Sequence, residues 1–204
     1  RAVDNMPVLA ALIVGLQRQP MPGVDGDDFD GHRVIGRELL ERALTHAREL
    51  QAAGADFVKA EGGTEILPQI RAILAAGIPF CGHLGMLPQH VLEEGGKYRI
   101  KGRDEAGRLR LLSDARELEQ AGVFACVLEL VTPPVARELT VACPRMVTIG
   151  IGSGPDCDGQ ILVTPDLVGG FPWFTPRFVT PRARTGEEIR AAASQWLQEL
   201  NATS

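Results

Sequence analysis

The stretch ADFVKAEGG, residues 55–63, decides the fold class of this 204-residue chain. It is a short apolar run that ends on two glycines, and Gly54 separates it from a segment of helical period. A helix that ends at a glycine and leads into an apolar strand is typical of the crossover connections of parallel sheets. This order of helix, glycine and strand occurs three times along the chain, which indicates a β/α architecture.

Six apolar runs of strand length support that interpretation. They are rich in valine and isoleucine and lack the polar alternation of half-exposed strands, so we expect buried parallel strands. The runs cover residues 8–14, 56–60, 78–84, 123–130, 146–152 and 159–163.

Two apolar stripes of helical period precede the second and third of these runs. The first stripe ends at Gly54 and the second at Gly77. Their members are Leu40, Ala43, Leu44, Ala47 and Leu50, followed by Ile66, Ile70, Ile73 and Leu74.

Two later helices are predicted from their caps. One begins at Ser113, carries Ala115 and Leu118 on its buried face, and ends at Gly122. The last helix begins at Thr185 with a capping-box pattern. Its predicted buried face consists of Ile189, Ala192, Trp196 and Leu197.

Two segments depart from this pattern. Residues 17–36 are rich in proline, glycine and aspartate, which predicts a long mobile loop. Residues 167–185 place aromatic side chains between prolines, which favours an ordered wrapping or interface segment over a helix or strand.

Composition narrows the range of partners. The net charge is −5 and lysine and arginine do not cluster, so we expect a small-molecule ligand rather than nucleic acid or a membrane surface. The four cysteines lack zinc-ribbon spacing, which indicates free thiols in a reducing cytoplasm. No apolar run approaches the roughly 18 to 20 residues of a membrane span, and the first residues lack the features of a signal peptide.

Charged and polar side chains gather at the ends of three predicted strands. Lys59 and Glu61 are two residues apart, so they point to one face of their strand. His83 and Glu129 occupy the ends of the next two strands. Because chemistry in parallel α/β proteins gathers at the carboxyl ends of strands, we expect all four side chains to share one rim.

Each of these residues also has a structural alternative. Lys59 and Glu61 fit an ion pair inside a barrel, and His83 alone fits a hydrogen-bonded core histidine. Glu129 is harder to explain in this way, because an unpaired buried carboxylate is costly and its strand offers no cation. Their joint position favours a site.

Other motifs are less informative. The run GIGSGPDCDGQ, residues 150–160, lacks the third glycine and the helix of a dinucleotide-binding motif, so a tight turn is favoured. Ser153 within it lacks the frame of a hydrolase nucleophile. His83 and His90 lack the spacing of a zinc site, whereas an oxygen ligand such as Glu61 suits magnesium.

Five motifs in register resemble one known family. They are VKAEGG (58–63), PFCGHLGMLPQ (79–89), KGRDEAG with LLSDA (101–115), VLELV (127–131) and IGIGSGPDCDGQILV (149–163). Together they resemble ketopantoate hydroxymethyltransferase, a (β/α)8 barrel of the TIM type in the phosphoenolpyruvate/pyruvate-like superfamily. The resemblance implies that residues 1–204 form a single β/α barrel domain, with its first two strands missing from this chain.

The resemblance also implies an activity. The family transfers a hydroxymethyl group from 5,10-methylenetetrahydrofolate to a 2-oxo acid, 2-oxoisovalerate, with Mg2+ bound, in pantothenate synthesis. By position, Glu61 resembles a metal-site acid and Glu129 the catalytic base, while Lys59 and His83 resemble residues that contact the oxo acid. Lysine and metal would both favour negative charge on the enolate.

The chain departs from the family at its amino end. The first two family strands, with one metal-site aspartate, have no counterpart, and Ala11 falls at the second metal-site aspartate. With Glu61 alone, magnesium would bind weakly. The chain is therefore either a fragment or a diverged relative with altered, metal-free aldolase or lyase chemistry on a 2-oxo acid. Thr132 and Lys101 also replace the usual proline and glutamine.

Two further functions stay open. A lyase or mutase of the phosphoenolpyruvate mutase and isocitrate lyase type is disfavoured, because its KKCGH-like motif is missing. A non-catalytic barrel paralogue would fit an alanine at position 11. The resemblance also implies a homo-oligomer, for which FPWF (171–174) and FVTP (178–181) are candidate contacts.

Overall fold

The structure is a computed structural model that describes residues 31–92 and 95–202. The chain divides into two compact units, one that ends at Gly159 and one that runs from Gln160 to the carboxyl terminus.

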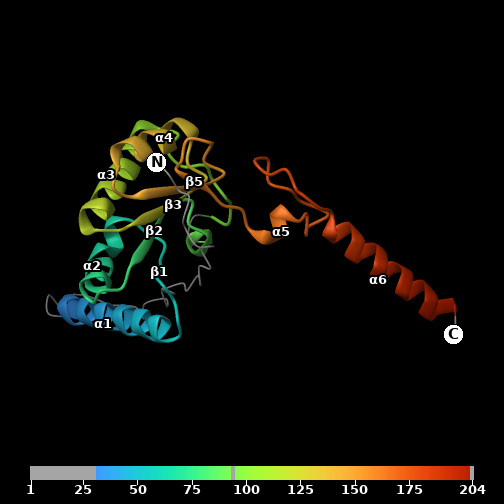
Figure 1. Cartoon of the computed structure of the whole chain (residues 1–204), viewed down its shortest axis with the longest axis horizontal. Coiled ribbons are helices and arrows are strands. Elements are labelled where there is room, and N and C mark those ends of the chain that lie inside the picture. The colour runs from blue at the N-terminus through green and yellow to red at the C-terminus, as the bar shows by residue number, and fades with distance from the viewer. Residues whose placement is uncertain (1–30, 93–94, 203–204) are drawn as a thin grey trace. The chain divides into compact units, whose positions relative to one another are not determined.

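The first unit is organised by a parallel sheet whose strands follow the order of the chain, and the sheet's fifth strand lies at the boundary between the two units (Figure 1). Its strands are β1 Val58–Lys59, β2 Phe80–Gly85, β3 Ala125–Glu129, β4 Val147–Ile151 and β5 Gly159–Gln160. The first four are parallel neighbours. Sequential order is the arrangement of an arc of a β/α barrel, whereas a doubly wound sheet reverses its order. The predicted α/β class with a parallel sheet is confirmed.

Helices α1 to α4 lie along one face of this sheet (Figure 1). They are α1 Gly31–Ala52, α2 Leu67–Ala75, α3 Glu105–Ala121 and α4 Pro133–Ala142, with short 3-10 turns η1 Thr64–Ile66 and η2 Pro88–His90. The apolar stripes predicted on α1 and α2 are confirmed, because Ala43, Ala47, Ile70 and Ile73 are buried in the main core. Phe80, Leu84, Cys126 and Leu128 meet them from the sheet.

The other face of the sheet has a core of its own. Its buried side chains are Cys81, Ala125, Val127, Ile149 and Ile151, and Phe57 packs against them. Strands with apolar side chains on both faces match the predicted absence of polar alternation. Burial raises the pKa of the Cys81 thiol to about 11.

Two helices differ from their predictions. The third predicted helix begins after Asp104, whose carboxylate accepts a hydrogen bond from the Gly107 N–H at 2.7 Å. Ser113 is therefore an exposed residue within α3 and not its cap. Helix α4 was not predicted, although Pro133 in its first turn is a recognised helix-start signal.

Several strand and loop predictions need adjustment. The predicted strand 8–14 lies outside the described residues, as does most of the predicted loop 17–36. Residues 31–36 are helical, since the single Gly36 does not suffice to break a helix. The runs 56–60 and 159–163 form ladders over only two residues each.

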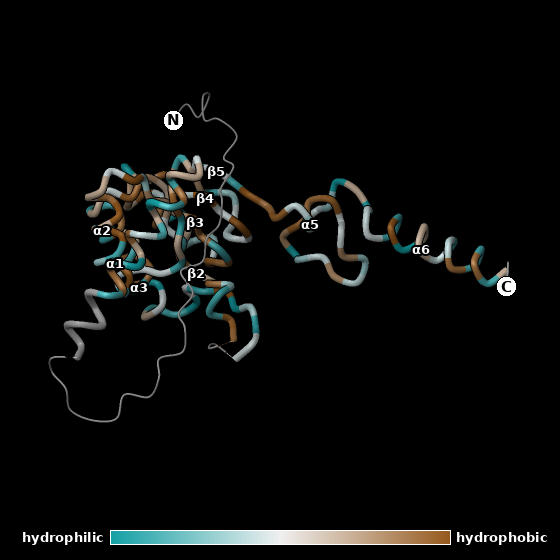
Figure 2. Tube along the Cα trace, turned by 90° about the horizontal axis from the view of Figure 1, so that it is seen from below, coloured by the Kyte–Doolittle hydropathy of each residue, from teal (hydrophilic) through white to brown (hydrophobic). Residues whose placement is uncertain are grey.

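The second unit contains α5 Thr164–Leu167 and α6 Thr185–Ala202. Residues 168–184 between them are tied to this unit, since Arg182 N–H donates to the Leu167 carbonyl at 2.7 Å and Thr185 N–H donates to Val168 at 3.1 Å. Apolar and polar residues alternate along α6 (Figure 2).

The start of α6 is confirmed, but its predicted burial is wrong. Ile189, Trp196 and Leu197 are 68%, 60% and 53% exposed, and Ala192 is exposed too. Periodicity shows that a helix has an apolar face, but not which partner covers it.

Among the described residues, no helix is both long and apolar enough to cross a membrane.

Candidate functional site

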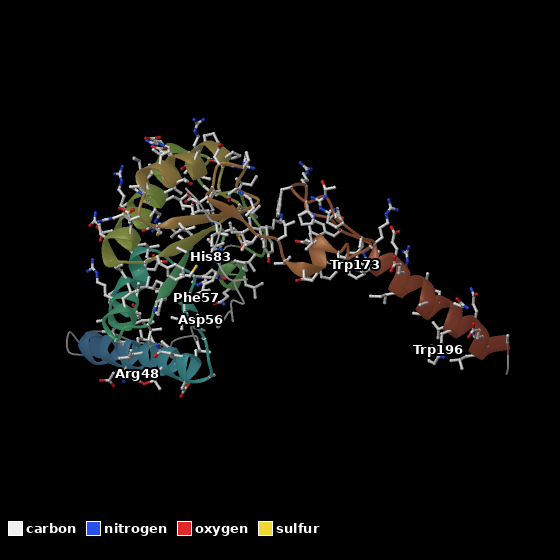
Figure 3. All side chains as sticks on the ribbon, viewed as in Figure 1. Arg48, Asp56, Phe57, His83, Trp173 and Trp196 are labelled. Carbon is white, nitrogen blue, oxygen red and sulfur yellow. The ribbon has the colours of Figure 1, made fainter. Side chains whose placement is uncertain are left out.

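Strands β1, β2 and β3 bring the four predicted side chains together. Lys59 ends β1, and Glu61 follows two residues later. His83 lies within β2, and Glu129 ends β3. His83 and Glu129 alternate with the residues that face the helices, so they point to the sheet face opposite α2 and α3 (Figure 3 labels His83).

His83 is the centre of this group and is only 3% exposed. Its Nδ1 atom lies 3.0 Å from Lys59 Nζ and 3.8 Å from Glu61 Oε1. Its Nε2 atom lies 3.3 Å from Glu129 Oε2. Both carboxylates therefore meet one imidazole, as the common rim of strand ends predicted.

The contact with Lys59 fixes the tautomer that this geometry requires. An ammonium group has no acceptor, so Nδ1 must accept and the neutral ring carries its proton on Nε2. That N–H lies 3.3 Å from Glu129 Oε2, but Nε2 is without a hydrogen-bond partner among the described residues. A buried unpaired N–H is costly, and a ligand oxygen would relieve it.

Glu61 is held beyond the end of β1. Its Oε2 accepts a hydrogen bond from the Gln89 N–H at 3.0 Å. The next residue, Gly62, has φ +134° and donates its N–H to the His83 carbonyl at 3.1 Å. Among the described residues, Lys59 and Glu61 form no ion pair with each other, so Lys59 is paired with His83 instead.

The backbone of Glu129 is fixed by β2. Its carbonyl accepts a hydrogen bond from Met86 N–H at 2.8 Å, and Gly85 stands opposite it in the ladder. Gly85 has φ +97°, and a Cβ atom there would collide with the Glu129 carbonyl oxygen. Only glycine allows this approach.

Leu130, the residue after Glu129, has a left-handed backbone with φ +47°. Its N–H donates to the Ile151 carbonyl at 2.9 Å, and its own carbonyl accepts from the Lys101 N–H at 2.8 Å. A non-glycine residue in this region is strained, and such strain persists only where the surroundings hold it.

Ser153 reinforces the same turn. Its hydroxyl donates to the Leu128 carbonyl at 2.6 Å and accepts from the Val131 N–H at 3.0 Å, and the residue is fully buried. This bridging role agrees with the expectation that Ser153 is not a nucleophile.

The described residues alone do not fit a magnesium site. Glu61 offers carboxylate oxygens, but one of them already accepts the Gln89 N–H. Within residues 31–92 and 95–202, no group of three or more histidine, cysteine, aspartate or glutamate side chains converges as metal ligands. Magnesium prefers six oxygen donors in octahedral geometry.

Two backbone donors of this site were not predicted from the sequence. They are the N–H groups of Gln89 and Met86, which hold Glu61 and Glu129 respectively. Every residue except proline carries an N–H, so the sequence holds no signal for them.

The fold and the site define a sequentially ordered parallel β/α protein with a polar site at the carboxyl ends of its strands. The family model for ketopantoate hydroxymethyltransferase matches residues 36–204 of this chain. The chain belongs to that family.

Individual relatives agree with this assignment. Proteins called 3-methyl-2-oxobutanoate hydroxymethyltransferase share 48% identity over 153 residues in Moorella thermoacetica and 41% over 197 residues in Thermobifida fusca. These alignments cover 75% and 97% of this chain, and 56% and 68% of the relatives. The chain thus spans little more than half the length of the first relative.

A solved structure of a protein described as a phosphonomutase, from Burkholderia cenocepacia J2315, is also similar. Its TM-score is 0.42 at 18% identity, over 78% of this chain and 64% of that one.

Proposed function

We propose that the protein transfers a hydroxymethyl group from 5,10-methylenetetrahydrofolate to a 2-oxo acid, with 2-oxoisovalerate as the acceptor. The observation that supports this most directly is the contact of His83 with Lys59 on one side and Glu129 on the other. Family membership supplies the substrates.

The proposed chemistry begins at the carbon next to the ketone. Its proton is a weak acid, so the negative charge that develops on the oxo oxygen must be stabilised. Lys59 supplies a positive charge and His83 supplies the unpaired Nε2–H. Both would contact the oxygens of the oxo acid.

Glu129 is the proposed base. Its carboxylate is mostly buried, with 15% of the side chain exposed, and its main chain is fixed from both neighbouring strands. It would remove the proton from C3. Water would release the one-carbon unit from the folate as formaldehyde, leaving tetrahydrofolate. The enolate carbon would then add to the formaldehyde carbon, whose oxygen takes up a proton to become the hydroxyl group. Glu61 is the carboxylate expected to contribute to a magnesium site, which stays a prediction from the family.

The test is hydrogen exchange at C3, because exchange requires only the first step. The protein from its complete gene, with magnesium, should exchange the C3 proton of 2-oxoisovalerate in deuterated water. Glu129→Gln should lower that rate by about 100-fold or more. Glu117→Gln is the control, since Glu117 pairs with Arg71 on the helix layer. Absence of exchange in the unmodified protein, or equal rates for Glu129→Gln, would reject the proposal.

A cytoplasmic homo-oligomer is proposed as well. Family membership supports it, and the segment FPWF is exposed within the second unit, where Trp173 and Phe174 are 79% and 61% exposed. Figure 3 labels Trp173. In FVTP, Val179 is buried.

A further inference from the structure

We infer that Asp114, on the helix layer of the sheet, is a positioning residue for the Glu61 carboxylate. The inference rests on the proposed function, because it assigns Asp114 a role in that same site. Asp114 touches none of the four site side chains and acts through the turn that follows β1.

Asp114 is an unusual residue for its place. It is 8% exposed and lies on the face of α3 that also buries Leu111, Leu112, Ala115 and Leu118. Among the described residues it forms no ion pair. A buried carboxylate without a cation needs hydrogen bonds to offset its desolvation.

Those hydrogen bonds come from the turn after Glu61. The Oδ1 atom of Asp114 accepts from the Thr64 N–H at 3.1 Å and from the Thr64 hydroxyl at 2.8 Å. Thr64 is the first residue of η1, and the preceding residue, Gly63, has no side chain with which to cap it. Asp114 therefore caps η1 from a different helix.

The presence of glycine at position 63 and the burial of the Asp114 carboxylate depend on each other. A Cβ atom on Gly63 would collide with the Asp114 carboxyl group. The carboxylate thus occupies the space that a side chain at Gly63 would fill, and it supplies the cap that the glycine cannot.

The capped residue, Thr64, is only three residues from Glu61 in the chain. Glu61, Gly62, Gly63 and Thr64 are consecutive, and Gly62 donates to the His83 carbonyl at 3.1 Å. The turn is thus held by β2 at one end and by α3 at the other. Without Asp114, the far end is released and the Glu61 carboxylate loses its fixed place beside His83.

The experiment compares Asp114→Ala with Asp104→Ala in the protein from its complete gene. Both changes remove an aspartate that caps a helical N–H, but Asp104 caps α3 itself, through Gly107, and does not touch the Glu61 turn. For Asp114→Ala we expect KM for 2-oxoisovalerate to rise about tenfold, as when a supporting partner of a site ligand is lost, with kcat within about threefold. Asp104→Ala should leave KM unchanged.

A purely structural role would give a different result. Partial unfolding lowers the active fraction, so kcat would fall while KM stayed the same. That outcome for Asp114→Ala, or an equal rise in KM for Asp104→Ala, would overturn the inference.

Amide hydrogen exchange of the peptide 58–66 gives a second readout that does not need activity. The Thr64 amide should lose protection in Asp114→Ala and keep it in Asp104→Ala. If the unmodified protein shows no C3 exchange, the proposed function fails while this measurement still decides whether Asp114 holds the Glu61 turn. Unchanged Thr64 protection in Asp114→Ala would reject the inference on its own.

Discussion

Glycines at single positions allow the site residues to approach one another. Gly85 and Gly122 have the same φ of +97°, but their surroundings differ. A Cβ atom at Gly85 would meet the Glu129 carbonyl, whereas a Cβ atom at Gly122 would meet nothing within 4 Å. Comparing alanine substitutions at these two glycines therefore separates the loss of stability caused by backbone strain from the loss caused by a steric collision.

Gly85→Ala should destabilise the protein more than Gly122→Ala. Each alanine adopts a left-handed backbone, which costs about 1–2 kcal/mol. Gly85→Ala also forces β2 away from β3, and overpacking of this kind adds about 1–3 kcal/mol. Urea unfolding followed by circular dichroism measures both free energies, and equal losses for the two variants would contradict the collision.

The Cys81 thiol should be inert in the folded protein. Burial raises its pKa to about 11, so at pH 8 only about one thiol in a thousand is ionised. Iodoacetamide should modify Cys81 much more slowly in buffer than in urea, as mass spectrometry of its peptide would show. Equal rates in both conditions would mean that β2 is not buried as described.

At the scale of elements, α3 and α4 are joined by one arginine. Arg108 on α3 contacts Glu105 at 2.7 Å within its own helix and Glu138 of α4 at 2.5 Å. The hydrogen bond from Arg108 holds the pKa of the Glu105 carboxyl below its ordinary value. Glu105 also lies in the first turn of α3, where a negative charge is favoured.

This contact predicts a dependence of stability on pH. Because the pKa of Glu105 is lower in the folded than in the unfolded chain, its contribution is present above the unfolded value and is lost as the pH falls through the folded value. Glu105→Gln should lower the urea midpoint slightly at pH 7, and the difference should shrink as the pH falls below the ordinary pKa of a glutamate. The pair is exposed, so added salt should weaken the effect. A difference that grows toward pH 3 would contradict this origin.

Elements were predictable where hydrophobic period and a glycine stop agreed, as in α1 and α2, and in the three apolar runs that form β2, β3 and β4. The start of α3 was missed because the residues around it, RDEAGRLR (103–110), are mostly charged and form no apolar stripe. Only the Asp104 cap indicates where the helix begins. Helix α4 was missed although Pro133 is a helix-start signal, because proline also breaks helices and its position in the first turn shows only in the structure.

Of the site, the convergence of its side chains could be predicted from the sequence, but their individual contacts could not. Parallel strands end at one rim, so the convergence of His83 with both carboxylates followed from strand ends alone. Its pairings did not follow, since β1 leaves the sheet after Lys59 and Glu61 lies in the turn beyond it. Which nitrogen of His83 meets which partner depends on that turn, and no sequence pattern encodes it.

At the scale of the whole molecule, the second unit exposes many apolar side chains. On α6 these include Ile189, Trp196, Leu197 and Leu200, each at least 46% exposed. A helix whose apolar face is exposed is marginal by itself, because packing of that face supplies most helical stability. This exposure is what an associating segment would show.

The proposed homo-oligomer therefore predicts a change in mass. The double variant Trp196→Glu and Leu197→Glu should shift the protein to a smaller species, because two charges would be buried at the contact. Val141→Glu, on α4 and 73% exposed, should leave the mass unchanged. Light scattering coupled to size-exclusion chromatography measures both, and an unaltered mass for the double variant would place the contact elsewhere.

The clamped main chain around Glu129 has one practical consequence. Met86 N–H donates a hydrogen bond to the Glu129 carbonyl, and the Ser153 hydroxyl bonds the main chain on either side of it. None of these hydrogen bonds involves the Glu129 carboxylate. The main chain at residue 129 is thus held independently of its side chain, so the side chain can be replaced without moving the backbone. Substitution of residue 129 by a shorter acid, a thiol or an unnatural amino acid should therefore leave the backbone in place. Residue 129 is the position of this protein best suited to the introduction of a new reactive group.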